Sequence, residues 1–237
     1  MPIHRIILSA QHKDWIIIVT CLACIVVPPL FFSYDLLSIV LNHGYSPLLH
    51  TISAFAIQPF GWIERVGILT VGLTLIGVGI VWFFWLARRV GVLFRVAGAL
   101  LGLVGLCFML IGAFNTDVTS LDKSLHGVIH CFTFIAVLVL FPCFCIVLAL
   151  SLRRRLFNRK GIALYTGITG LVGLLFIVSL IIPVLNSVPS GLAERLLASV
   201  DLFWLTIAGS QITRLARVTG QLMGPEVISK KRLKVFG

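Results

Sequence analysis

The chain has 237 residues, of which 59% are hydrophobic and only 11% are charged. A soluble domain carries roughly 25% charged residues, so this composition excludes an ordinary water-soluble protein. The formal net charge is +11, but the basic residues stand at the ends of apolar runs, where they act as topology signals. No zinc-finger spacing or basic–aromatic interleaving is present, and we therefore expect no nucleic-acid partner.

Six apolar runs are long enough to cross a bilayer, which requires about 20 mostly apolar residues. In chain order, the predicted spans cover residues 15–34, 63–86, 96–114, 125–152, 162–185 and 192–212. Prolines inside or near these spans, among them Pro28, Pro29 and Pro142, predict kinks. The sequence therefore predicts an all-α, polytopic membrane protein. We expect one transmembrane domain over residues 1–237, a six-helix bundle of three hairpins, with a basic cytoplasmic tail at 218–237.

Positive charge is distributed unevenly between the two sides of this bundle. All but three of the 19 Lys and Arg residues fall on the side that holds both termini, and the exceptions are Arg65, Lys123 and Arg195. Because short basic loops stay in the cytoplasm, both termini are expected inside, in a multi-pass protein of the cytoplasmic membrane. Membrane lipids are the expected partners, and a partner protein or a homo-oligomer is compatible with this arrangement.

A short repeat opens the second and sixth spans. Gly61-Trp-Ile-Glu64-Arg65 precedes one, and Gly191-Leu-Ala-Glu194-Arg195 precedes the other. A Glu–Arg pair at a span entrance can lock helices together or hold an anionic headgroup, because guanidinium and carboxylate groups form strong charged hydrogen bonds.

The junction before the fourth span carries a candidate metal site. His126 and His130 are four residues apart and so share one face of a helix. Two such imidazoles, with Asp117 or Asp122 as an oxygen ligand, can hold zinc and leave a position open for water. Haem is not expected, because these neighbours cannot occupy opposite faces of one porphyrin. A purely structural role also fits, with Asp117 or Ser124 as a helix cap.

Asp201 lies two turns into the sixth span, where a lone carboxylate costs several kcal/mol unless it is paired or hydrated. Its candidate partners at similar depth are His130, Arg195 and Arg65. Together with His130 it can form a proton relay. It can equally form a buried interhelical hydrogen bond or ion pair that only fixes the register of the helices.

Three stretches resemble one prokaryotic family of six-helix membrane proteins, the domain-of-unknown-function family 998 (DUF998). They are 51–65 leading into a Gly-rich span, 114–117 followed by His126-Gly-x-x-His130, and 191–195 before a span with Trp204. Asn115 stands where family members commonly have proline. The resemblance covers about residues 15–217 and implies the six-helix architecture, with distant similarity to DRAM and Sfk-type membrane proteins. It implies no established activity.

We therefore expect a polar cluster at the outer face that binds a lipid headgroup, a small ligand or a partner protein. Its members are Glu64, Arg65, Asp117, His126, His130, Glu194, Arg195 and Asp201. No catalytic residue is assigned, and a non-enzymatic role is favoured. Two alternatives stay open: a metal-dependent hydrolase of the outer leaflet, with zinc on His126, His130 and Asp117, and a proton-coupled carrier.

Overall fold

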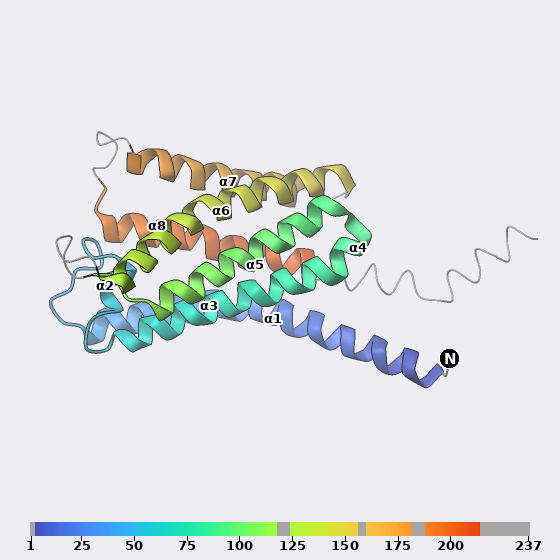
Figure 1. The fold of residues 1–237 in the computed structure, drawn as a ribbon, viewed down its shortest axis with the longest axis horizontal. Coiled ribbons are helices and arrows are strands. Elements are labelled where there is room, and N and C mark those ends of the chain that lie inside the picture. The colour runs from blue at the N-terminus through green and yellow to red at the C-terminus, as the bar shows by residue number, and fades with distance from the viewer. Residues whose placement is uncertain (1–2, 118–123, 156–159, 182–187, 214–237) are drawn as a thin grey trace, which may run out of the picture.

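A computed structural model describes residues 3–117, 124–155, 160–181 and 188–213. Within these ranges the protein is all-α (Figure 1). The helices are α1 Ile3–Leu41, α2 Ile52–Phe55, α3 Gly61–Val81, α4 Ala87–Val90, α5 Val92–Ala113, α6 Leu125–Arg155, α7 Lys160–Ile181 and α8 Ser190–Trp204. Two π-helical segments, Trp82–Leu86 and Leu205–Gly209, continue α3 and α8.

The part of the chain that is described contains six helices long and apolar enough to cross a membrane, which confirms the predicted fold class. They cover Trp15–Leu41, Gly61–Leu86, Val92–Ala113, Leu125–Arg153, Lys160–Ser179 and Ser190–Thr213. The predicted first span, residues 15–34, ended too early. Helix α1 continues through Pro28 and Pro29 to Leu41, so Asp35 lies within a helix rather than in a loop. The predicted end of the fifth span, at 185, falls outside the described residues.

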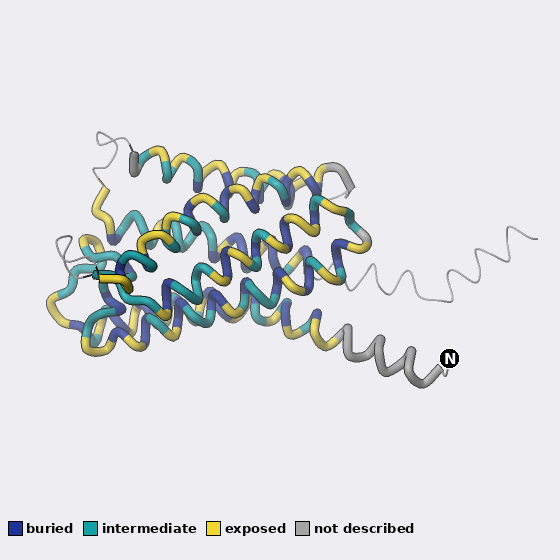
Figure 2. Tube along the Cα trace, in the orientation of Figure 1, coloured by how far each residue is buried: buried dark blue, intermediate teal, exposed yellow. Residues whose placement is uncertain are grey.

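The helices run side by side, so their connections gather at two ends (Figure 1). The α1–α3 connection lies at one end, together with the start of α6 and the start of α8. The α4 turn and the ends of α6 and α7 that carry Arg153 and Lys160 lie at the other. We call these the acidic end and the basic end. Buried positions face the middle of the bundle, and α7 at its edge is the least buried span (Figure 2).

Helices α3 and α5 touch through their backbones. A methyl group added at Gly79 would lie 2.7 Å from the Gly98 carbonyl oxygen, and one added at Gly105 would lie 2.7 Å from the Gly72 carbonyl oxygen. Helices in lipid associate through close packing of this kind, which only small residues permit. The turn between the two helices passes through Gly91, whose φ of 118° is a conformation that favours glycine.

An aromatic centre joins the π-helical continuation of α3 to α6 and α8. Trp82, Phe144 and Trp204 are fully buried and stack edge to face or tilted against one another. The Trp82 indole donates a hydrogen bond to the Thr213 hydroxyl, and the Trp204 indole donates one to the Thr166 hydroxyl, both at 3.1 Å. Each indole N–H is therefore satisfied inside the bundle, as burial in an apolar setting requires.

Candidate functional site

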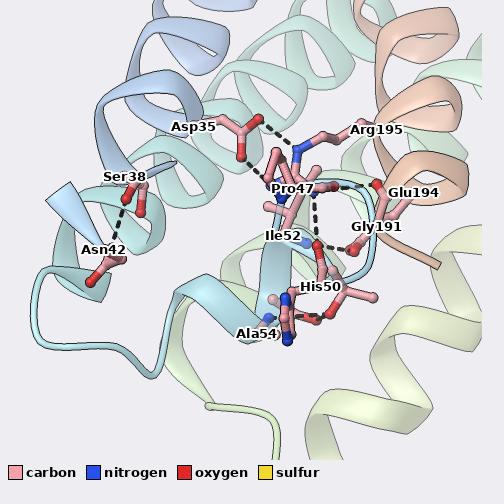
Figure 3. Close-up of polar contacts among 12 residues, drawn as sticks. Asp35, Ser38, Asn42, Pro47, His50, Ile52, Ala54, Gly191, Glu194 and Arg195 are labelled. Carbon is pink, nitrogen blue, oxygen red and sulfur yellow. Dashed lines mark hydrogen bonds and ion pairs between the residues drawn. The ribbon is translucent and has the colours of Figure 1, made fainter. Parts of the chain in front are cut away.

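The connection between α1 and α3, residues 42–60, covers the acidic end and is held there by one guanidinium (Figure 3). We call this segment the outer cap, because it covers one end of the bundle. Arg195, at the start of α8, binds the Asp35 carboxylate of α1 through two hydrogen bonds of 2.8 and 2.9 Å. The same side chain donates to the carbonyl oxygens of Pro47, His50 and Gly191. Arg195 thus ties α1, the outer cap and α8 to one point.

Further contacts fix the outer cap to α8. The Glu194 carboxylate accepts a 2.7 Å hydrogen bond from the Ile52 amide at the start of α2. Gly191 lies directly under the cap, because a Cβ there would come within 2.3 Å of the His50 carbonyl oxygen. Gly61, its counterpart in the repeat, is equally close to the Ala56 carbonyl oxygen. Both glycines of the repeat are therefore required by the close approach of the cap.

Glu64 lies beneath this cap without a partner. Its side chain is fully buried, and neither carboxyl oxygen has a hydrogen-bond partner among the described residues. The groups that act on it electrostatically are Asp35, Arg195 and Glu194. Because Arg195 is already bound to Asp35, Glu64 has no cation of its own within the part of the chain that the structure describes. A buried carboxyl in this situation is either protonated or neutralised by a group outside the described residues.

A cavity of about 70 Å³ lies next to the cap, between α8, α6, α3 and α5. Its polar lining comes from Ser53, His130, Glu194 and Asp201, and its walls are apolar and aromatic. Oδ1 of Asp201 is enclosed and has no hydrogen-bond partner in the described structure. His130 is buried, and its Nδ1 lies 2.8 Å from the Phe114 carbonyl oxygen at the end of α5. Two carboxyl groups and an imidazole thus share one small space.

The α5–α6 junction is arranged as a helix cap. The Ser124 hydroxyl accepts from the Gly127 amide at 3.0 Å, which is the usual geometry of an N-cap. Both oxygens of Asp117 bind Ser124, one at its amide and one at its hydroxyl. A negative charge at this position also interacts favourably with the positive end of the α6 dipole. His126 is exposed and packs against the ring of Phe114.

These contacts give two of the three proposed zinc ligands other partners. The Asp117 oxygens are occupied by Ser124, and His126 is exposed while His130 points to a backbone carbonyl. No group of three His, Cys, Asp or Glu residues with the geometry of a metal site occurs among the described residues.

A family model described as "Protein of unknown function (DUF998)" matches residues 25–211, which is most of the chain. The chain belongs to the DUF998 family. Searches of the curated proteins and of the solved structures found no match.

In this DUF998 protein the predicted cluster divides into parts. Glu64, Glu194, Arg195 and Asp201 gather under the outer cap and beside the cavity, with His130 contributed by α6. Asp117 and His126 belong to the helix cap instead. Arg65 forms no ion pair with any of the described acids.

Sequence reasoning missed Asp35, the partner of Arg195, and the cap carbonyls that Arg195 binds. Asp35 could have been found as a charged residue in an otherwise apolar run, but its partner lies 160 positions away.

Proposed function

We propose that this multi-pass membrane protein binds a small cationic ligand in the cavity beneath the outer cap. The observation that carries the proposal is the unpartnered, enclosed Asp201 carboxyl oxygen in a cavity that Glu194 also lines. We place the acidic end on the outer side of a prokaryotic cytoplasmic membrane, because the described basic residues concentrate at the opposite end.

The sign of the ligand follows from the charges around the site. Four carboxyl groups, those of Asp35, Glu64, Glu194 and Asp201, lie under the outer cap or beside the cavity, and Arg195 forms the only ion pair in the described ranges. Its guanidinium donates to Asp35 and to three carbonyl oxygens, so little donor capacity is left for an anionic headgroup. A cation in the cavity would pair with the Asp201 carboxyl group, one oxygen of which has no hydrogen-bond partner among the described residues.

The size of the ligand follows from the cavity. About 70 Å³ accommodates a few water molecules or one small ammonium group, since a water occupies about 30 Å³ in the liquid. The aromatic walls, which include Phe31, Phe108 and Phe134, also favour a cation over an anion, because ring faces carry partial negative charge. An alkali ion or a short primary amine fits both requirements.

The test is ligand-dependent stability of the purified protein in detergent. Chloride salts of sodium, potassium, ammonium and methylammonium are compared at constant ionic strength, with the bulky N-methylglucammonium as the reference cation. We expect one small cation to raise the free energy of unfolding by about 2.7 kcal/mol at 100 times its Kd. Asp201→Asn should abolish this gain. Asp117→Asn is the matched control, because it removes a carboxylate at the same end but outside the cavity.

Two results would overturn the proposal. One is a wild-type protein that responds equally to all the cations, including the bulky reference. The other is an Asp201→Asn variant that keeps the full gain, since the cavity would then not be the binding site. An Asp201→Ala and His130→Ala double variant serves as a second test, because it removes two of the polar groups that line the cavity.

A proton-coupled carrier is the second candidate, because His130 and Asp201 line the same cavity. Such a carrier predicts a pH-dependent flux in reconstituted vesicles that disappears in Asp201→Asn. The hydrolase alternative has no comparable support, because its three ligands are engaged elsewhere or exposed.

A further inference from the structure

A second hollow lies far from the outer cap, on the outer surface of the bundle between α6 and α7. It is a groove of about 600 Å³ at the basic end. Its floor consists of the small residues Ala149, Ala163 and Gly167, and the Cβ that Gly167 lacks would lie 3.7 Å from the Ala149 methyl group. Leu150 and Leu164 form its rims and are largely exposed. The groove exists because two helices face each other with residues too small to fill the space.

Two cations complete this groove at the end of the spans. Arg153 is the last residue of α6 that lines the groove, and Lys160, the first residue of α7, lines it from the opposite helix. Both side chains are exposed, and neither forms an ion pair with the acids that the structure describes. The hollow therefore combines a long apolar surface with two positive charges that pair with no described acid, at the depth where a span meets water.

We infer that this groove binds an anionic phospholipid, with an acyl chain along its apolar floor and the phosphate headgroup against Arg153 and Lys160. The groove lies on the surface of two membrane spans that points away from the centre of the bundle. It therefore faces the lipid tails. A purely apolar protein helix would fill the groove but leave the two cations without a counter-charge. A phospholipid supplies both an apolar chain and a negative headgroup. Basic pockets between transmembrane helices are suited to anionic headgroups for this reason.

The inference is independent of the cation site, which lies at the opposite end and involves none of these residues. The preference for an anionic lipid over a zwitterionic one should be roughly 30-fold, since each Lys or Arg beside an anionic headgroup multiplies affinity about five-fold.

The experiment is native mass spectrometry of the purified full chain titrated with phosphatidylglycerol or with phosphatidylcholine of identical acyl chains. Three variants are compared with the wild type. Arg153→Gln with Lys160→Gln removes the two charges of the groove. Arg88→Gln with Arg95→Gln removes two charges from the α4–α5 turn at the same end, away from the groove. Gly167→Leu fills the floor and leaves every charge in place.

We expect the groove-charge variant to lose the preference for phosphatidylglycerol and the turn variant to keep it. Gly167→Leu should weaken the binding of both lipids several-fold. Equal affinity of the wild type for the two lipids would overturn the inference. So would a preference that survives in the groove-charge variant, or one that falls equally in the turn variant, because the charge would then act from the whole surface rather than from the groove.

Discussion

Replacing Arg195 with alanine should destabilise the protein more than any other single change at the acidic end. The substitution removes both hydrogen bonds to Asp35 and three to carbonyl oxygens. The Arg195 and Asp35 side chains are only 15% and 9% exposed, so the carboxylate would stay buried without its partner. Breaking a buried ion pair in this way costs about 3–5 kcal/mol. We expect a loss of that size in the free energy of unfolding.

A double-mutant cycle shows whether the loss comes from this pair. The free energy of unfolding is measured in mixed micelles with increasing sodium dodecyl sulfate, followed by tryptophan fluorescence, for Asp35→Ala, Arg195→Ala and the double variant. We expect a coupling energy of at least about 2 kcal/mol, near the upper part of the range for residues in contact. Arg195→Lys should recover only part of the stability, since an ammonium group lacks the planar fork that binds both carboxylate oxygens.

The control is Arg88→Ala, which removes an exposed cation at the other end of the bundle. It should change the free energy of unfolding by no more than about 0.5 kcal/mol. A coupling energy below about 0.5 kcal/mol between Asp35 and Arg195 would refute the reasoning, because the ion pair would then contribute no more than an exposed one.

Three further predictions follow from the packing and the junction. Gly191→Ala should cost about 1–3 kcal/mol in the same assay, because its Cβ would lie 2.3 Å from a carbonyl oxygen of the outer cap. Gly77→Ala is its control, since that Cβ would meet open space, and an equal loss there would contradict the prediction. Trp204→Phe should cost about 1 kcal/mol for the lost indole hydrogen bond, and an unchanged stability would show that this bond contributes nothing. Metal analysis of the purified protein should find no stoichiometric zinc, whereas one zinc per chain that disappears in His126→Ala/His130→Ala would restore the hydrolase hypothesis.

The six spans could be predicted from the sequence because a bilayer imposes a simple requirement. Every backbone polar group in lipid must be satisfied within its own helix, so a span needs a long apolar run that composition alone reveals. The end of α1 was missed because a charge normally marks the end of a span. Asp35 does not end α1, since Arg195 neutralises it inside the bundle.

The candidate site was predictable as a set of residues but not as an arrangement. The repeat identified Glu64 and Glu194 as equivalent, yet one is left without a partner while the other binds the Ile52 amide. The difference arises from the path of the outer cap, which passes over α8 and binds there. Nothing local in the sequence encodes that path, because its contacts join residues more than 140 positions apart.

The glycine contact between α3 and α5 has a consequence for the order in which the molecule forms. The two helices are close neighbours along the chain and need only the turn at Gly91 to meet, so they can associate as soon as both have inserted. The outer cap depends on α8, whose Arg195 lies 160 residues after Asp35. Closing so long a loop is slow compared with local pairing. The glycine hairpin is therefore the natural early folding unit, and the cavity next to the outer cap is completed only when the last helix has entered the bundle.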